Sequence, residues 1–553
     1  MRRVFRTAIA PALSFPWRRA SHPTRVAEIA LMIHRFQCYA PVYRAVAAVA
    51  ALSLAGCAVG PDFKTPTAPT GAGYTVDAMP GATASAATTG GNEQRFVAGM
   101  DIPAQWWTLF HSKELDALVT EAIARNPDMD AARASLKAAH EAVRVQQGDY
   151  YPQINASFSP TRQQIAAPLA SPAASGDDLY NLHTAQVSVS YTLDLFGANR
   201  RQVESLVAQA DAQRFALEAT YLTLTSNVVA AAIQEASLRG QLNATQEIVT
   251  LQQRSLDLLH RQYDLGQVAQ ADIAAQEAAL AQAQAAIPPL EKQLAQQRDA
   301  LARLLGRMPN ERIDATFDLT QLQLPDALPV SLPSQLVEQR PDVRAAQAQW
   351  HAAGAAVGVA VAARLPSITL SASYGASAEI ARELFSPGTA FWTLAGNLTQ
   401  PIFAGGALLH KQRGAEAAYE QAGAQYRGTV LTAFQNVADT LHALRTDADA
   451  LRASLNAERA AQRSLTIAQK QLELGDISYL TLLNAEQTYQ QARVALVQAQ
   501  ANRYADTVAL FQALGGGWWH RDDVSVDSAT ASGTSPSVKS PTPSPATSPA
   551  SAG

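Results

Sequence analysis

Cysteine is nearly absent from this chain of 553 residues, which contains only Cys38 and Cys57. Once an N-terminal segment is removed, no disulfide framework can form. The ten histidines are scattered and include no His-x-x-x-His pair, so the pattern supports no metal site. The sequence also lacks a Gly-x-Ser-x-Gly elbow and a Gly-rich phosphate loop. We therefore predict no metal, no non-covalent cofactor and no enzymatic activity.

Aromatic residues are also scarce, at 7% of a chain that is 48% hydrophobic. Alanine and glutamine dominate stretches such as "ADIAAQEAALAQAQAA". Small side chains suit closely packed helices better than one large globular core. Beyond residue 56 the chain has 35 basic and 46 acidic residues, a net charge of −11, which argues against nucleic acid as a partner.

The N-terminal region has the features of a secretory signal. Arg35 and Arg44 precede the apolar run "AVAAVAALSLAG", which is shorter than the roughly 20 residues that a membrane-spanning helix needs. Leu54-Ala55-Gly56-Cys57 resembles the bacterial lipobox, in which the cysteine is lipidated and becomes the new N-terminus. We predict a signal peptide over residues 1–56, with Met32 as an alternative start, and a diacylglycerol and an N-acyl chain on Cys57. A buried structural cysteine is the alternative.

Two series of residues recur along the chain, which indicates that one structural unit is used twice. The first series recurs at an offset of 214 residues and the second at an offset of 209. In the first, Asn126-Pro127-Asp128 and Tyr151-Pro152 recur as Arg340-Pro341-Asp342 and Leu365-Pro366. In the second, Gln262, Leu265, Gly266 and Glu277 recur as Gln471, Leu474, Gly475 and Glu486.

Each copy predicts a helix, two strands and a long helical pair. In "QVSVSYTLDLF" apolar and polar residues alternate, as in a strand with one face of each kind. The predicted strands cover residues 154–163, 185–196, 367–377 and 391–402. Tilted strands of about ten residues can cross a membrane, but four cannot close a barrel, and an open edge is excluded from hydrocarbon. Three chains would supply twelve strands; a soluble four-stranded sheet is the alternative.

The helical segments are long and carry heptad repeats. Residues 198–306 predict two helices of about 40 and 60 residues that turn near Gly240, and the second copy is expected to turn near Ala450. Pro288-Pro289 should kink the first pair, and the second copy has no counterpart. Hydrophobic residues every seven positions predict a coiled-coil seam: Leu280, Ile287, Leu294 and Leu301, then Val437, Leu444, Leu451, Leu465 and Leu472, with Glu458 interrupting the second series.

An ordered set of motifs resembles the TolC-like outer-membrane factors, specifically the lipoprotein channels of resistance-nodulation-division (RND) efflux pumps. The resemblance covers residues 57–519 and rests on the lipobox, "PAQWWTLF", "YTLDLFGANRR", "LGRMP", "RPDVRAAQ", "PIFAGGAL", "AFQNVADTL", "YLTLLNAEQTY" and "ALGGGWW".

That resemblance implies a membrane α/β protein that forms a homotrimer. Four strands per chain would build a twelve-stranded β-barrel, and the long helices would continue it as an α-helical coiled-coil barrel through the periplasm. The expected segments are a lipidated N-terminus and equatorial segment (57–125), a first repeat (126–306), an equatorial connector (307–336), a second repeat (337–519) and a disordered tail (520–553).

The implied function is passive export from the periplasm to the exterior, in the outer membrane of a Gram-negative bacterium. The cargo would be drugs or other toxic small molecules. A periplasmic membrane-fusion adaptor and an inner-membrane RND-type transporter would be the partners, and the transporter would supply the energy. The open alternatives are the outer-membrane component of type I protein secretion or of metal efflux, or a lipid-tethered periplasmic coiled-coil scaffold.

A gate is expected at the periplasmic tip, where helical pairs can splay without breaking a barrel. In a trimer each side chain becomes a ring, and a ring of carboxylates can bind cations or pair with arginines. The candidates, on the expected approach to the second turn, are Asp439, Leu444, Arg445, Asp447 and Asp449.

Overall fold

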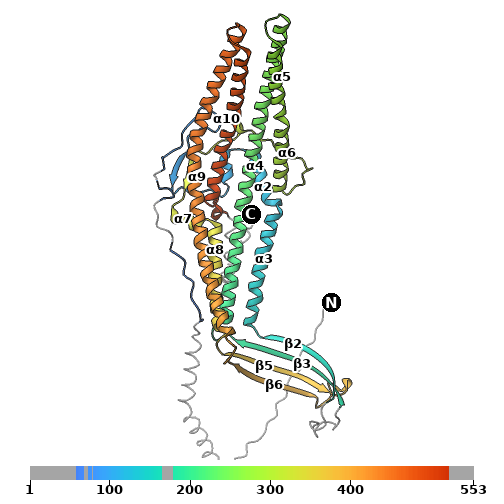
Figure 1. The fold of residues 1–553 in the computed structure, drawn as a ribbon. Helices are drawn as coiled ribbons and strands as arrows, with labels where there is room; N and C mark the ends of the chain where they lie inside the picture. Colours follow the sequence, from blue (N-terminus) through green and yellow to red (C-terminus); the bar gives the residue numbers. More distant parts are fainter. Residues whose placement is uncertain (1–57, 68–72, 77–78, 165–178, 522–553) are drawn as a thin grey trace, which may run out of the picture.

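The computed structural model describes residues 58–67, 73–76, 79–164 and 179–521, and Cys57 and the tail lie outside them. These residues form an elongated molecule with a β-sheet at one end, two helical hairpins at the other and a mixed equatorial region between them (Figure 1).

The secondary structure follows the chain in the order predicted from the two copies. The helices are α2 (Lys113–Arg125), α3 (Pro127–Gln147), α4 (Ala198–Asp264), α5 (Gln270–Ala285), α6 (Ile287–Leu304), α7 (Pro333–Gln339), α8 (Pro341–Ala362), α9 (Ala407–Glu473) and α10 (Tyr479–Ala513). The strands are β1 (Arg95–Ala98), β2 (Gln153–Gln164), β3 (Leu179–Leu193), β4 (Ala327–Val330), β5 (Ser367–Ala378) and β6 (Ala390–Thr399). Short 3₁₀ turns among the described residues include η1 (Trp106–Phe110), η4 (Leu319–Gln321) and η6 (Trp518–His520).

The four long strands form one antiparallel sheet in the order β2-β3-β5-β6. Its two outer pairs are hairpins between consecutive long strands, whereas the central pair joins the two halves of the chain. In that central ladder His183 lies opposite Ala378 and Leu193 opposite Ile368. The sheet is therefore continuous across the two halves of the chain.

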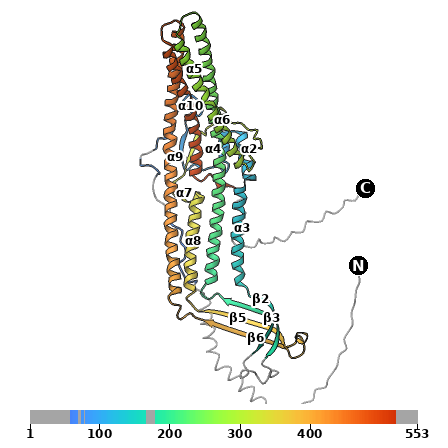
Figure 2. The same ribbon diagram turned by 45° about the vertical axis from the view of Figure 1, so that its right-hand side comes forward.

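The helices lie side by side in one curved layer (Figure 2). Below the equator the order is α3, α4, α8 and α9, and above it α10 packs between α4 and α9 while α5 and α6 pack on α4. Helices α4 and α9 have 67 residues each, so each extends about 100 Å at 1.5 Å per residue. By length and composition α4 could cross a membrane, but its most apolar stretch is mostly buried inside the molecule.

The structure corrects the expected positions of the helical turns. Both α4 and α9 continue some 24 residues further than predicted, and they end beside Gly266 and Gly475, whose φ angles are 72° and 78°. Such left-handed conformations favour glycine. Gly240 lies inside α4, where a Cβ atom would be 2.9 Å from Val497 Cγ1. Gly240 thus permits close approach of α4 and α10 and does not end a helix.

The two return helices differ as their proline content predicts. A break at Ala286 separates α5 from α6, and Pro288-Pro289 lies in the first turn of α6, where a proline's missing amide is tolerated. Helix α10 runs through 35 residues without interruption.

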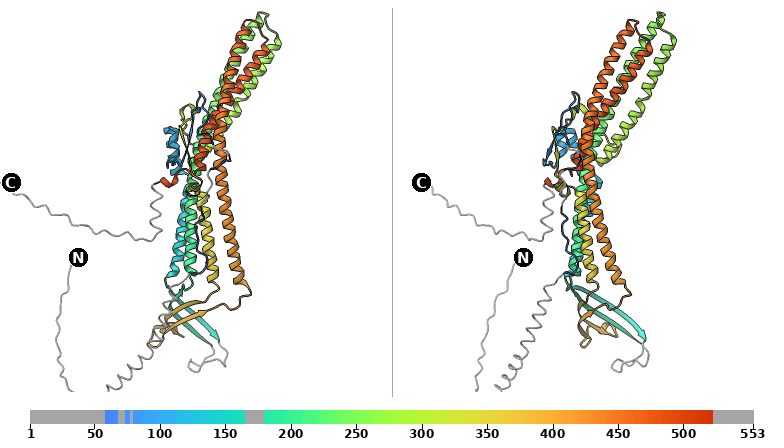
Figure 3. Two further views of the ribbon diagram at one scale, coloured as in Figure 1. Left: turned by 90° about the vertical axis from the view of Figure 1, so that its left-hand side faces the viewer. Right: turned by 60° about the vertical axis from the view of Figure 1, so that its left-hand side comes forward.

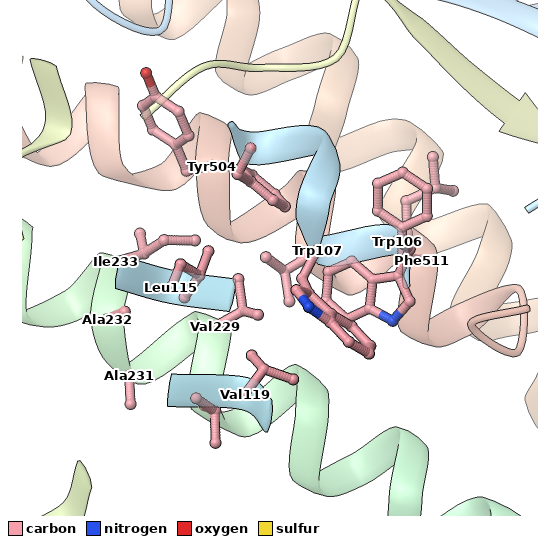
Figure 4. Packing of buried hydrophobic residues seen from close by; sticks show 14 of the residues in the cluster. Trp106, Trp107, Leu115, Val119, Val229, Ala231, Ala232, Ile233, Tyr504 and Phe511 are labelled. Atoms are coloured by element: carbon pink, nitrogen blue, oxygen red, sulfur yellow. The ribbon is translucent and has the colours of Figure 1, made fainter. Parts of the chain in front are cut away.

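The main hydrophobic core lies at the equator and joins segments that are far apart in sequence (Figure 4). Trp106 stacks on Phe511 with ring centroids 5.2 Å apart, and Tyr504 donates a hydrogen bond to Leu322 O at 2.8 Å. Strands β1 and β4 pair in parallel here. Figure 3 shows these equatorial elements gathered on one side of the helices.

Candidate functional site

The two faces of the four-stranded sheet have opposite chemistry. One cross-strand row consists of Asn155, Ser188, Ser373 and Thr393, and the adjacent row consists of Ile154, Val189, Ala372 and Leu394. Because successive residues of a strand point to opposite faces, these two rows lie on opposite sides of the sheet. On the polar face Thr192 and Thr369 share a hydrogen bond of 3.1 Å between their hydroxyl oxygens.

The apolar face is uncovered in the single chain. Ile154, Trp392 and Leu394 are 69%, 74% and 74% exposed. Within the described residues, β2 and β6 each pair with a neighbour on one side only. A sheet with an exposed apolar face, a polar face and two unpaired edges has the surface chemistry of a segment of a membrane barrel.

The first described residues are held where the sheet meets the helices. Val59 N donates to Phe196 O at 3.2 Å, and the buried Arg201 guanidinium contacts Val59 O at 3.0 Å and Asp62 Oδ1 at 2.6 Å. The backbone passes so close to α8 that a Cβ on Gly358 would lie 2.7 Å from Val59 O. Ala58, which follows Cys57, lies beside Gly197, between the end of β3 and the start of α4.

A buried polar cluster joins the two helical hairpins near their tips. Ser255 Oγ of α4 donates to Glu486 Oε1 of α10 at 2.7 Å, and Gln276 Nε2 of α5 donates to Gln252 O at 2.7 Å. Tyr479 of α10 donates to Gln276 Oε1. Burial raises the pKa of the Glu486 carboxyl, and the hydrogen bond from Ser255 only partly opposes that shift.

A second buried polar group lies at the equator. Arg503 of α10 is fully buried and donates to Leu444 O at 2.9 Å, to Thr83 Oγ1 at 3.2 Å and to Asn92 O at 3.3 Å. Burial and the adjacent Asp447 raise the pKa of Asp506 to about 7, although Arg503 acts in the opposite direction. Arg503 thus fastens the equatorial segment to α9 and α10.

The comparison with protein families decides what this combination of sheet and hairpins belongs to. The family model described as outer membrane efflux protein matches residues 118–307 and 332–516, which is most of the chain. The chain belongs to the outer membrane efflux protein family. It is an outer-membrane protein, and its relatives are channel components of efflux pumps rather than enzymes.

Curated relatives resemble this outer membrane efflux protein over most of their own length. The probable efflux pump outer membrane protein TtgC of Pseudomonas putida is 29% identical over 475 residues, which cover 86% of this chain and 95% of TtgC. The outer membrane protein OprJ of Pseudomonas aeruginosa is 30% identical over 491 residues, which cover 86% of this chain and 96% of OprJ.

Solved structures share the fold. The outer-membrane channel OprN is 27% identical with a TM-score of 0.74, over 84% of this chain and all of OprN. The outer membrane protein VceC of Vibrio cholerae is 26% identical with a TM-score of 0.70, over 75% of this chain and all of VceC. The Campylobacter jejuni CmeC channel, at 22% identity and a TM-score of 0.74, shows the same fold over 86% of this chain and 98% of CmeC.

The predicted gate residues of this efflux protein do not lie at the tip. They occupy the middle of α9, 24 to 34 residues before its end at Glu473, or about 35 to 50 Å along the helix. The error follows from the expected turn near Ala450. A role for these side chains in gating stays a prediction.

The same residues also point in different directions. Asp439 and Arg445 are exposed, and Asp449 is exposed in an ion pair of 2.8 Å with Arg452. Leu444 is fully buried in the equatorial core. Asp447 is half-buried beside Asp506. The five residues therefore do not form one constellation within the chain.

Sequence reasoning missed Arg201, Arg503 and Asp506. A charge inside an otherwise apolar stripe was the available signal for Arg503, because the residue 209 positions earlier is Leu294, a member of the predicted seam. The sequence identified Glu486 only as a recurring residue and did not predict that it is buried, whereas its counterpart Glu277 is exposed.

Proposed function

We propose that the chain forms a homotrimeric channel that passively conducts drugs or other toxic small molecules across the outer membrane. The observation that carries this proposal is the sheet with one apolar and one polar face and two unpaired edges. Pairing β6 of one chain with β2 of the next would satisfy both edges, and three chains would close a barrel of twelve strands. The apolar face would then meet lipid and the polar face water.

The long helices would extend this barrel as a tunnel into the periplasm. We infer that the two copies of the helix, strand and hairpin unit arose as one repeat. The equally long α4 and α9 and the matched glycines at their ends support that reading. Three chains would then give the tunnel approximate sixfold character, and the break at Pro288-Pro289 would limit it.

The cargo and the partners follow from the relatives only in outline. Relatives are named for toluene efflux, antibiotic efflux and pyoverdine export, which favours small molecules over secreted proteins. A periplasmic adaptor and an inner-membrane RND-type transporter would complete the pump. The transporter would supply the energy, because a water-filled barrel has no means of driving transport itself.

The N-terminus of the mature protein would carry the lipid on Cys57. The contacts of Val59 and Asp62 support this arrangement, because they hold the adjoining residues at the sheet end of the molecule. A Cys57→Ser variant should lose metabolic labelling with palmitate. It should nevertheless stay in the membrane fraction, because the shared barrel would retain it.

Bilayer recording of the purified trimer tests the channel. We expect discrete conductance steps from the wild-type protein and from Cys57→Ser. A lipid-tethered scaffold gives the opposite pair of results: no conductance from correctly folded protein, and release of Cys57→Ser into the soluble fraction without detergent.

The gate prediction is tested on the same recordings. Three Asp439 carboxylates in the channel wall would attract cations, so Asp439→Ala should lower cation over anion selectivity about twofold. Asp449→Ala is the comparison, because Asp449 is already paired with Arg452. Unchanged selectivity in Asp439→Ala channels would count against a role in the conduction path.

A further inference from the structure

The tip of the second hairpin carries a groove that the single chain leaves open. The groove lies between α9 and α10 and has a volume of about 560 Å³; its lining includes Ser464, Ile467 and Ala485. Ile467 is 56% exposed, which is high for a large apolar side chain in a helical hairpin.

The corresponding groove of the first hairpin is occupied. Counting back 209 residues from Ser464 and Ala485 gives Ser255 on α4 and Gln276 on α5. Both of these side chains contact α10, Ser255 through Glu486 and Gln276 through Tyr479. Each hairpin thus offers the same groove, and within the chain one of the two is filled.

The occupant of the filled groove also has a counterpart. Counting back 209 residues from Glu486 of α10 gives Glu277 of α5. Glu486 is 1% exposed, whereas Glu277 is exposed. Glu277 and Ser464 are therefore the counterparts of Glu486 and Ser255, which form a buried hydrogen bond within the chain. The structure of the single chain gives Glu277 and Ser464 no such contact with each other.

The order of the helices brings these two residues to opposite edges of the chain. Above the equator the order is α5, α4, α10 and α9, so α5 lies at one edge and α9 at the other. When copies of the chain form a closed ring, the α5 edge of one meets the α9 edge of the next. The α4–α10 contact within a chain would be repeated as an α9–α5 contact between chains.

We propose that Glu277 of each chain lies in the groove between α9 and α10 of a second copy and accepts a hydrogen bond from Ser464 of that copy. This inference rests on the proposed trimer and deepens it. Around the tip of the trimer, three α4–α10 contacts within chains would then alternate with three α9–α5 contacts between chains.

The contacts between chains lack part of the hydrogen-bond network that supports the contact within a chain. Within the chain, Tyr479 of α10 donates to Gln276 of α5, and Gln276 donates to Gln252 O of α4. The counterpart of Gln276 in the second hairpin is Ala485, which has no side-chain amide and can make neither hydrogen bond. Opening of the tip would therefore begin between chains, where fewer buried polar contacts must be broken.

Chemical cross-linking of the purified trimer tests this arrangement, because the lipidated Cys57 would leave the mature chain without a free thiol. The variant Glu277→Cys/Ser464→Cys is treated with a short bis-thiol-reactive reagent and run on a denaturing gel. We expect dimers and trimers as the main products. Ser255→Cys/Glu486→Cys is the matched control, which should cross-link only within the chain and so calibrates the reach of the reagent.

Each outcome of the cross-linking decides between specific statements. If the control pair reacts and the protein is trimeric by native mass spectrometry, but the Glu277/Ser464 pair gives only monomer, the inference is overturned and the channel proposal stands. A protein that is monomeric by native mass spectrometry overturns the proposed trimer itself. If an adaptor occupies the groove in the assembled pump, the groove is empty in the purified trimer, and the Glu277/Ser464 pair should give only monomer.

A second measurement avoids cysteines altogether. Glu277→Ala removes no described hydrogen bond within the chain, yet it should lower the temperature at which the SDS-resistant trimer dissociates. The same substitution in a Ser464→Ala background should have less than half that effect, because the two residues share one contact. Equal shifts in both backgrounds would contradict the pairing.

Discussion

The return helices of the two hairpins differ although each follows a helix of 67 residues. Helix α10 is continuous through 35 residues, whereas its counterpart is divided into α5 and α6 of 16 and 18 residues. Helix α10 packs between α9 and α4, and α5 and α6 lie at the edge of the chain on α4. Within one chain α10 is therefore covered on two sides, whereas the divided α5 and α6 pack on α4 and would meet a neighbouring chain on their other side.

The polar residues follow the same division. Arg503 and Glu486 are buried in α10, but the edge helices carry Leu294 and an exposed Glu277 at the corresponding positions. Whether a polar residue is buried and needs a hydrogen-bond partner therefore depends on where its helix lies in the cross-section of the chain. Substitutions that exchange features between the central and the edge helices should therefore have unequal effects on stability.

Introducing the proline of the edge helix into the central helix should be severe. Val497→Pro places proline at the position equivalent to Pro288, where it would remove an intrahelical hydrogen bond and clash with the preceding turn, at a cost of about 3 kcal/mol or more. We expect a much lower melting temperature of helical circular dichroism in detergent. Val497→Ala, which removes only packing, is the control, and similar melting of both variants would contradict the prediction.

Removing the buried guanidinium should be the next largest effect. Arg503→Ala leaves Leu444 O and the neighbouring acceptors without their donor, and unsatisfied buried polar groups cost about 1–3 kcal/mol each. We expect destabilisation of about 3 kcal/mol in the same melting experiment. Arg445→Ala, at an exposed position of α9, should be within about 0.5 kcal/mol of wild type.

A smaller effect is expected where the central helix passes α4. Gly240→Ala should gain about 1 kcal/mol of helix propensity, but the new Cβ would lie 2.9 Å from Val497 Cγ1. Overpacking of this kind costs about 1–3 kcal/mol, so we expect net destabilisation of about 1 kcal/mol. In a Val497→Ala background Gly240→Ala should instead become stabilising; destabilisation in both backgrounds would show that another contact is responsible.

The smallest expected effect is a pH dependence of the tip. Burial raises the folded-state pKa of Glu486 above its ordinary value of 4.5, so the folded chain retains a proton that the unfolded chain has lost. Stability is then greatest below pH 4.5 and decreases as the pH rises from there to the raised pKa.

Hydrogen exchange of amides at the tip, measured across that range, tests this dependence. Protection should fall with rising pH in wild type after correction for intrinsic exchange rates, and Glu486→Gln should remove the change. Glu473→Gln matches the substitution at an exposed position at the tip end of α9 and should keep the wild-type trend. A flat wild-type profile would show that Glu486 does not control the tip.

The sheet could be predicted closely because its signal is local. Alternation of apolar and polar residues placed the ends of the four strands within three residues of those of β2, β3, β5 and β6, except that β3 begins six residues earlier than predicted, at Leu179. The pairing of β3 with β5 could not be predicted in the same way, since it depends on how two distant segments meet.

The helical turns could not be located because glycine has two uses that look alike in sequence. Gly240 serves close packing against Val497, whereas Gly266 and Gly475 adopt left-handed conformations at the real turns. The repeated Leu-Gly pair was visible at both turns, but only a packing partner explains why Gly240 ends no helix. The misplaced gate residues follow directly from that ambiguity.

The central β3–β5 ladder has a consequence for how the chain folds. It pairs residues 183–193 with 368–378, so the whole first helical hairpin and the connector lie between the two strands. Contacts between residues so distant in sequence form slowly, because closing a long loop costs entropy before any contact is gained. The β2–β3 and β5–β6 hairpins are local and can form early, while the joined sheet must wait for both halves of the chain to be delivered. The complete four-stranded surface can therefore form only after the chain as far as Thr399, the last residue of β6, is available for pairing.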